Sequence, residues 1–167
     1  MLTKKEIRKE IKENNLVDNF CHLPTQLQPN GFDLTVSKVF RFKTKGKIDF
    51  SNSEREIPEC EEIKPKKENE DEDYGWWHLE PGVYKIRTKE EVNIPNDLLG
   101  ILFTRSSLLR IGCYTKHALI DSGFKGKLEF ILKAGPNGID LKENGRVCQV
   151  VFRKVKETEE YSGEYGE

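Results

Sequence analysis

The sequence lacks the features that would place it in several common classes of protein. No apolar run approaches the length of a membrane-spanning helix, and residues 1–13 are too charged for a signal peptide. Lys and Arg number 28 against 29 Asp and Glu, so the basic excess of a duplex-DNA-binding protein is missing. These absences predict a soluble cytoplasmic protein with no nucleic-acid and no membrane partner. A small anion could still bind in a local basic pocket.

Cysteine is also scarce, and its spacing excludes the usual zinc sites. The four cysteines, Cys21, Cys60, Cys113 and Cys148, are far apart, and none forms a C-x-x-C pair or a Cys/His pair with zinc-ligand spacing. The P-C-x-x-C segment of zinc-dependent base deaminases is absent as well. We therefore expect free thiols in a reducing compartment.

The composition is polar for a globular protein of this length. The 167 residues are 35% apolar and 34% charged, with a mean hydropathy of −0.70. Part of the chain should therefore lie outside the core. We expect a single domain over residues 1–167, with a charged, solvated insertion at about 51–74 and a flexible tail at about 158–167.

The pattern of the remaining chain predicts an all-β fold with a short N-terminal helix. Thr3 and Glu6 have the spacing of a capping box, and Ile7 and Ile11 lie on one helical face. Short apolar and β-branched runs then alternate with turn signals. Strands are expected at residues 36–42, 83–88, 99–103, 116–120, 127–133 and 147–155. This rhythm favours a distorted β-barrel or jelly roll over an α/β sheet.

The segment Arg105-Ser106-Ser107-Leu108-Leu109-Arg110 follows an apolar strand and predicts one turn of helix closed by Gly112. Two hydroxyls and free N–H groups at the start of that turn suit a phosphate chain. Arg110 shares the face of the serines, and Arg105 adds a guanidinium that can grip phosphate oxygens. Considered alone, an ordinary surface turn explains these residues better.

The segment Ile120-Asp121-Ser122-Gly123-Phe124-Lys125-Gly126 predicts a tight turn between two strands. Asp121 could be a general base that deprotonates water, and Phe124 could pack on a sugar. Asp also caps turns routinely through its side chain, and by itself that interpretation is preferred.

Two polar residues lie inside apolar strands. Asp33 opens one strand and could be structural or help to hold a metal-bound water. Gln149 interrupts another, and a polar side chain there needs a partner, either a backbone group or a ligand.

Four segments in this order resemble the dUTPase/dCTP deaminase superfamily. They are Leu27-Gln28-Pro29-Asn30-Gly31-Phe32-Asp33-Leu34, the stretch 105–110, the stretch 120–126 and Gly145-Arg146-Val147-Cys148-Gln149. The opening helix and Pro81-Gly82 look like the dCTP deaminase branch in particular. Each motif alone is weak, whereas four in order outweigh the plainer interpretations given above.

The resemblance implies a distorted β-barrel that assembles as a homotrimer with active sites between subunits. It implies Mg²⁺ on the substrate triphosphate, held through phosphates and water rather than by direct protein ligands. Asp121 matches the carboxylate that activates water. The other substrate-binding residues it implies are Arg105, Ser106, Ser107, Arg110 and Gln149 for the phosphates, Phe124 for the sugar, Glu129, Phe130 and Ile131 for the pyrimidine edge, and Tyr161 from the tail.

One position decides between the two reactions of the superfamily. Deaminases carry an essential Glu ten residues after the Asp of the turn, and here that residue is Ile131, which cannot transfer a proton. We therefore expect a dUTP diphosphatase that converts dUTP to dUMP and pyrophosphate. The alternative is a dCTP deaminase, or a bifunctional enzyme, in which a two-residue shift lets Glu129 replace the missing acid. A third possibility is a non-catalytic nucleotide-binding module.

Overall fold

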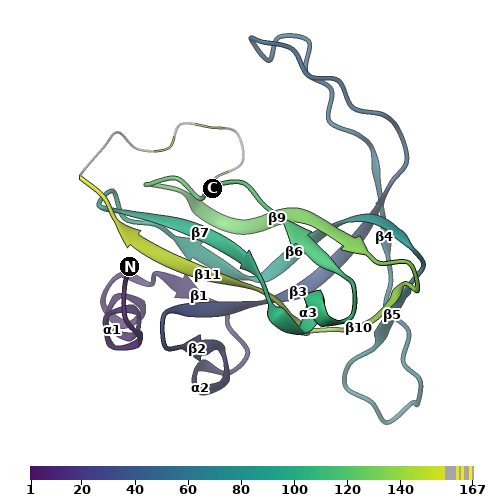
Figure 1. The fold of residues 1–167 in the computed structure, drawn as a ribbon, viewed down its shortest axis with the longest axis horizontal. Coiled ribbons are helices and arrows are strands. Elements are labelled where there is room, and N and C mark those ends of the chain that lie inside the picture. The colour runs from purple at the N-terminus through teal and green to yellow at the C-terminus, as the bar shows by residue number, and fades with distance from the viewer. Residues whose placement is uncertain (157–160, 162, 164–165, 167) are drawn as a thin grey trace.

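The core is a strongly curved antiparallel sheet in the order β7-β11-β3-β6-β9-β8, seen in the computed structural model in Figure 1. The structure describes residues 1–156, 161, 163 and 166. The sheet strands are β3 (Gly31–Phe42), β6 (Gly82–Asn93), β7 (Leu98–Thr104), β8 (Tyr114–Lys116), β9 (Lys125–Ala134) and β11 (Arg146–Lys154). Short strands β1 (Val17–Asp18), β2 (Leu27–Gln28) and β4 (Cys60–Ile63) pair with β6, β3 and β3, respectively. A separate ribbon pairs β5 (Trp76–Leu79) with β10 (Ile139–Lys142).

The two end strands of the sheet meet, so that the sheet nearly closes into a barrel. The Thr104 hydroxyl on β7 donates to the Thr115 carbonyl on β8 at 2.9 Å and accepts from the Thr115 N–H at 3.1 Å. Nearby, Gly100 and Ile120 exchange two backbone hydrogen bonds of 2.9 and 3.0 Å. The predicted all-β, barrel-like fold is confirmed.

Alternation along the strands fills the interior. On β6 the even-numbered residues from Tyr84 to Val92 are buried, and on β9 Leu128, Phe130 and Leu132 are buried. Side chains of a strand alternate between its two faces, so this pattern turns one face of each strand into the core. The predicted strand at 116–120 is shorter and earlier in the structure, because β8 ends at Lys116 and Ile120 makes only an isolated bridge.

The N-terminal helix α1 (Lys4–Asn14) has the predicted capping box. The Glu6 N–H donates to the Thr3 hydroxyl at 3.4 Å, and the Thr3 N–H donates to the Glu6 carboxylate at 2.7 Å. Ile7 is fully buried, and the Leu2 N–H donates to the Phe152 carbonyl at 2.8 Å, which anchors the helix start to β11. Two shorter helices, α2 (Leu23–Gln26) and α3 (Ser106–Arg110), complete the fold.

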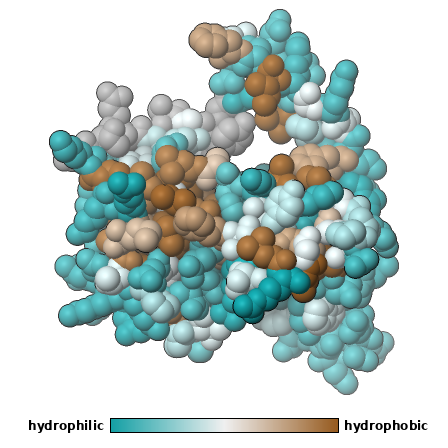
Figure 2. Space-filling view, in the orientation of Figure 1, coloured by the Kyte–Doolittle hydropathy of each residue, from teal (hydrophilic) through white to brown (hydrophobic). Residues whose placement is uncertain are grey.

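The charged segment at 51–74 is not a solvated loop throughout. Its middle forms β4, which pairs with β3, and the Trp77 indole donates to the Ile63 carbonyl at 2.7 Å. The chain between β3 and β4 forms a ribbon that stands away from the barrel, and Figure 2 shows apolar residues on it. Ile48, Phe50 and Ile57 there are strongly exposed. Most of the tail predicted at 158–167 lies outside the described residues.

Candidate active site

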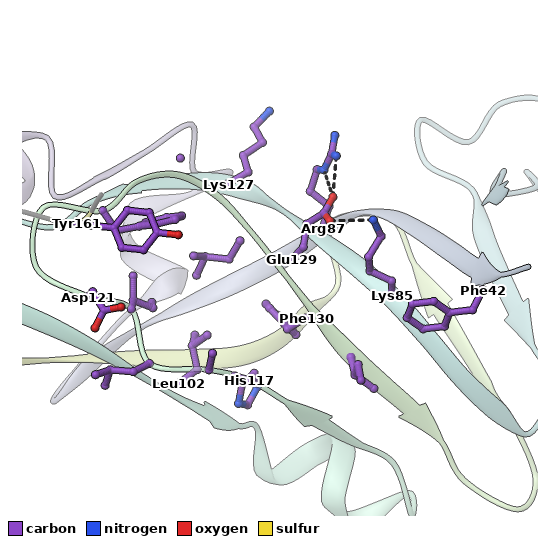
Figure 3. Close-up of a pocket in the computed structure, with 17 residues that line it drawn as sticks. Phe42, Lys85, Arg87, Leu102, His117, Asp121, Lys127, Glu129, Phe130 and Tyr161 are labelled. Carbon is purple, nitrogen blue, oxygen red and sulfur yellow. Dashed lines mark hydrogen bonds and ion pairs between the residues drawn. The ribbon is translucent and has the colours of Figure 1, made fainter. Parts of the chain in front are cut away.

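A cleft of about 750 Å³ lies between β9, β6 and the segment that joins β8 to β9. Figure 3 shows Asp121 and Tyr161 at one end of it and Phe42 at the other. Six residues predicted from sequence line it, namely Asp121, Phe124, Glu129, Phe130, Ile131 and Tyr161. The structure therefore gathers the predicted base-and-sugar side of the site in one place.

Asp121 is presented to this cleft by a tight turn. The Phe124 N–H donates to the Asp121 carbonyl at 3.2 Å, and Gly123 has the left-handed φ of +79° that such a turn requires. In the described residues, the turn closes through this carbonyl and not through the Asp121 carboxylate. The side chain is exposed to solvent, so the carboxylate can reach a water or a ligand.

Phe124 forms an apolar wall beside Asp121. Its ring is buried and meets the Tyr161 ring edge-on, with centroids 5.5 Å apart. The Tyr161 N–H donates to the Ser122 carbonyl at 3.0 Å, which fixes this part of the C-terminal segment against the turn. An aromatic surface of this kind suits the face of a sugar or a base.

Glu129 forms ion pairs with two cations on β6. Its carboxylate contacts Lys85 Nζ at 2.8 Å and Arg87 Nη2 at 2.6 Å, as Figure 3 shows. Burial raises the pKa of Glu129, but hydrogen bonds from Lys85 and Arg87 outweigh it and lower the pKa below its ordinary value. A carboxylate held ionised in this way is a poor general acid.

The pairing of β9 with β6 is regular around Glu129 and Ile131. Ile131 lies opposite Lys85 and Glu129 lies opposite Arg87, and pairing continues without a shift to Ala134 opposite Gly82. The irregularity in this pair lies on the other side, between Arg87 and Glu91. Ile131 and Glu129 both line the cleft, and the pairing beside them is regular.

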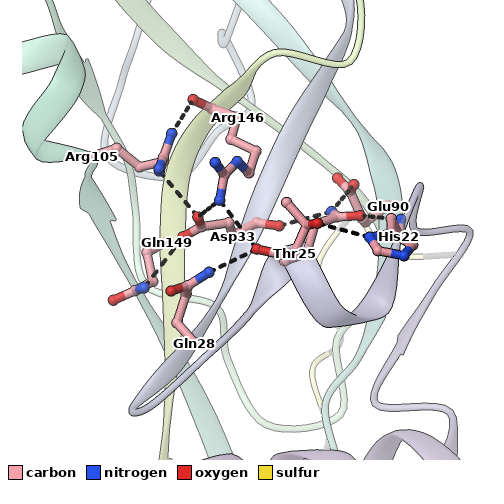
Figure 4. Close-up of polar contacts among 9 residues, drawn as sticks. His22, Thr25, Gln28, Asp33, Glu90, Arg105, Arg146 and Gln149 are labelled. Atoms are coloured by element: carbon pink, nitrogen blue, oxygen red, sulfur yellow. Dashed lines mark hydrogen bonds and ion pairs between the residues drawn. The ribbon is translucent and has the colours of Figure 1, made fainter.

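Two of the residues predicted to bind phosphate, Arg105 and Gln149, belong to a separate network centred on Asp33 (Figure 4). The Asp33 carboxylate lies 3.1 Å from Arg105 Nε and 3.0 Å from Arg146 Nη1, and it accepts from Gln149 Nε2 at 3.2 Å. Asp33 is only 2% exposed. Burial raises its pKa, and the two guanidinium groups act against that rise. Gln149 thus has the partner that its position in an apolar strand required.

Gly31 allows Gln149 to lie this close to β3. A Cβ atom on Gly31 would meet the Val150 carbonyl oxygen at 2.6 Å and the Gln149 Cγ at 2.9 Å. These distances leave no room for a larger residue at the start of β3.

Helix α3 follows Arg105, as the sequence predicted. Its first backbone N–H groups to bond within the helix are those of Leu108 and Leu109, both to the Arg105 carbonyl. The Ser106 and Ser107 N–H groups precede these bonds, and both serines and Arg110 are exposed. These groups are therefore available to an anion.

The two groups of predicted residues lie apart in one chain. Among the described residues that line the cleft, none belongs to the phosphate-side set of Arg105, Ser106, Ser107, Arg110 and Gln149. One chain thus presents Asp121 in the cleft and Arg105 and Arg110 outside it.

Sequence reasoning missed several residues near these sites. His117, which was given no role, lines the cleft, contacts the Phe130 ring edge-on and bonds through Nε2 to the Thr115 hydroxyl at 2.7 Å. Burial, with help from Lys116, lowers the pKa of His117 to about 4. Lys85 was also missed. Its position between the apolar residues Tyr84 and Ile86 of an alternating strand could have placed it on the face opposite the core.

Within the part of the chain that the structure describes, no group of three or more His, Cys, Asp and Glu side chains could hold a metal ion. None of the helices described is both long and apolar enough to cross a membrane.

The curved barrel, with its N-terminal helix, is the fold of a dCTP deaminase. The structure is similar to that of 2′-deoxycytidine 5′-triphosphate deaminase from Agrobacterium tumefaciens, with a TM-score of 0.67 and 19% identity. The match covers 92% of this chain and 48% of that one, so this chain spans about half the length of the deaminase. At this identity the likeness concerns the fold alone.

The sequence comparisons then identify the family. The model described as dCTP deaminase-like matches residues 1–155, and the chain belongs to that family. It is 41% identical to a probable deoxyuridine 5′-triphosphate nucleotidohydrolase of Methanococcoides burtonii, over 99% of this chain and 96% of that protein. It is 33% identical to the deoxyuridine 5′-triphosphate nucleotidohydrolase of Methanocaldococcus jannaschii, over 84% and 86% of the two chains.

Proposed function

We propose that the protein is a dUTP diphosphatase that hydrolyses dUTP to dUMP and pyrophosphate. The observation that carries this proposal is Ile131 in the cleft wall, where a deaminase needs an acid, with Glu129 held by Lys85 and Arg87. The names of the relatives in M. burtonii and M. jannaschii support the same reaction.

The exposed Asp121 carboxylate is the general base of the proposed reaction. It takes a proton from a water molecule as the water oxygen bonds to the α-phosphorus of dUTP. The bond from the α-phosphorus to the bridging oxygen breaks on the opposite side, and pyrophosphate leaves with the electron pair. Phe124 and Tyr161 provide the apolar surface beside Asp121.

Arg105, Arg110, Ser106, Ser107 and Gln149 are the proposed phosphate-binding residues. Charge that develops on the phosphates is then met by guanidinium and N–H groups already in position. A Mg²⁺ ion that enters with the triphosphate would neutralise further charge on the phosphate oxygens. The exposed groups at the start of α3 and the Asp33 network fit a partner rich in anionic oxygens.

The complete site is proposed to form between subunits of a homotrimer. Asp121 and the phosphate-side residues lie apart within one chain, so a second copy has to supply one of the two sets. The proposed location is the cytoplasm, with which four free cysteines are compatible.

One assay separates the possible functions. The purified protein and Mg²⁺ are incubated with dUTP and, separately, with dCTP, and pyrophosphate and ammonia are measured. Pyrophosphate from dUTP without ammonia from dCTP supports the proposal. Ammonia from dCTP would instead establish a deaminase, and binding of dUTP without turnover would establish a non-catalytic nucleotide-binding module.

Mixed oligomers test the intersubunit site. Asp121→Asn and Arg110→Ala each remove one half of the proposed site, and both residues are exposed, so both variants should fold. When the two inactive variants are unfolded together and refolded, some interfaces pair an intact Asp121 with an intact Arg110. Recovery of pyrophosphate release supports a shared site, whereas a mixture as inactive as its parents argues for a site within one chain.

A further inference from the structure

Glu90 is a buried carboxylate that the proposed mechanism does not use. It lies on β6 between Thr88 and Val92, is 0% exposed, and points into the barrel with the other even-numbered residues of the strand. An ionisable group in such a place is costly unless several hydrogen bonds hold it. Its position therefore calls for an explanation beyond filling the core.

Three donors converge on this carboxylate. The Gln26 amide donates to Oε1 at 2.7 Å, the Thr35 hydroxyl donates to Oε1 at 2.8 Å, and the Thr35 N–H donates to Oε2 at 2.8 Å. Figure 4 shows Glu90 together with the Asp33 network. Both carboxylate oxygens therefore accept hydrogen bonds from Gln26 or Thr35, which lie on either side of Asp33 in the sequence.

Gln26 extends the link to Asp33 itself. Its Nε2 also donates to the Asp33 carbonyl at 2.9 Å, and its Oε1 accepts from the His22 N–H at 2.9 Å. The main chain is therefore held on both sides of Leu34, at the Asp33 carbonyl through Gln26 and at the Thr35 N–H through Glu90. A rotation of this stretch of β3 would break these bonds.

The side chain of Asp33 carries the link to the phosphate side. It lies on the same short stretch of β3 and contacts Arg105 Nε, Arg146 Nη1 and Gln149 Nε2 at 3.0 to 3.2 Å. Since these contacts need a fixed carboxylate, any displacement of the Asp33 main chain would move the Arg105 guanidinium and the Gln149 amide.

We propose that Glu90 is a positioning residue for the phosphate-binding side of the site, acting through Gln26 and Thr35 on Asp33 and from there on Arg105 and Gln149. This inference rests on the proposed function for the roles of Arg105 and Gln149. A purely structural need at this position would be met by an aliphatic side chain, as at Ile86 and Val92 on the same face of β6. The carboxylate adds a fixed geometry that an aliphatic group cannot provide.

Glu90→Gln tests this inference, because the amide keeps the shape but turns an NH₂ group toward donors. Binding is measured for α,β-imido-dUTP with Mg²⁺ and, separately, for deoxyuridine, which has no phosphate. The expected result is an analogue affinity lower by roughly tenfold, the scale of one lost hydrogen bond to a charged group, with deoxyuridine affinity within about twofold of wild type. Glu91→Gln, on the opposite face of β6 from Glu90 and only partly buried, is the matched control and should change neither affinity.

A second measurement needs no ligand. In NMR spectra of ¹⁵N-arginine-labelled protein, the Arg105 Nε–H signal reports its ion pair with Asp33, and it should shift in Glu90→Gln but not in Glu91→Gln. Thr35→Val removes one donor to Glu90 without touching the carboxylate, so it serves if Glu90→Gln fails to fold, and it should give the same changes at smaller size.

The possible outcomes are distinct. An unchanged Arg105 signal in folded Glu90→Gln or Thr35→Val would overturn the inference, as would equal losses of affinity for the analogue and for deoxyuridine. A shifted Arg105 signal with a selective loss of analogue affinity supports it. Failure of the wild-type protein to release pyrophosphate from dUTP would overturn the proposed function while leaving the Arg105 comparison decisive for Glu90.

Discussion

Replacing Glu129 by Gln tests whether this carboxylate is an ion-pair partner or a proton carrier. The side chain is one third exposed, and its two cations, Lys85 and Arg87, are 24% and 40% exposed. The Glu129→Gln change keeps the size of the side chain and removes its charge. The backbone from Glu129 to Ile131, which is the part proposed to meet the pyrimidine, is unaffected.

The expected loss of stability follows from the contacts. Hydrogen bonds to charged groups contribute about 1.5–3 kcal/mol, whereas solvent-exposed pairs contribute about 0–1 kcal/mol. All three side chains are partly exposed, so solvent screens both ion pairs. Losing them together should lower the free energy of unfolding by about 1–2 kcal/mol. In a chain of this size, 1 kcal/mol lowers Tm by roughly 2–4 °C, so the expected drop is about 2–8 °C at neutral pH.

The stabilising effect of Glu129 should depend on pH. Because the two cations lower the pKa of Glu129 below its ordinary value of 4.5, the carboxylate stabilises the folded state above pH 4.5. That contribution is lost as the pH falls through the lowered folded value. The difference in Tm between wild type and Glu129→Gln should therefore be largest at pH 7 and should shrink as the pH falls below 4.5.

Thermal denaturation at a fixed protein concentration measures the effect, with Glu61→Gln as the control. Glu61 also pairs with a cation, Lys43, but both side chains are more than half exposed, so its change in Tm should be clearly smaller. Glu129→Gln should still release pyrophosphate from dUTP. An unchanged Tm at pH 7, a difference that does not shrink as the pH falls below 4.5, or complete loss of pyrophosphate release would each refute this account of Glu129.

Three further substitutions or measurements follow from the geometry. Asp121→Asn should leave Tm unchanged, because the side chain is exposed, and should slow pyrophosphate release by about 10²–10⁴-fold; a drop in Tm or normal turnover would contradict its role. Gly31→Ala should cost roughly 1–3 kcal/mol by overpacking against the Val150 carbonyl, measured by urea denaturation, and a neutral effect would show that β11 yields easily. His117 should take up a proton only near pH 4 in NMR titration. Its contribution to stability should fall as the pH drops from 6.5 toward that value, because the unfolded chain binds the proton first; titration near 6.5 in the folded protein would contradict its burial.

The parts of the fold that depend on local pattern were predictable. The capping box at Thr3 and Glu6, the helix at Ser106, and the strands that became β6, β7, β9 and β11 all follow from residue spacing within one element. Strand β4 was not predictable, because its charged sequence favours a loop and its pairing with β3 is a tertiary contact.

The same distinction holds for the site. The sequence indicated that Gln149 needs a partner but could not name Asp33, since 116 residues separate them. Glu90 lies beyond the strand predicted at 83–88 and between two charged residues, so only alternation with Tyr84, Ile86 and Val92 along the longer β6 places it inside. The ion pairs of Glu129 were equally hidden, because they depend on the register between β9 and β6.

The join between β7 and β8 has a consequence for how the barrel can move. Along this line two threonine contacts and one isolated bridge replace a continuous ladder, and β8 is only three residues long. Regions with few shared backbone hydrogen bonds open at low free-energy cost while the rest of a protein stays folded. The turn that carries Asp121 is held by other bonds, because the Gly123 N–H donates to the Ile94 carbonyl at 2.8 Å and the Ser122 hydroxyl donates to the Leu98 carbonyl at 2.6 Å. Local opening between β7 and β8 would therefore leave this turn in place.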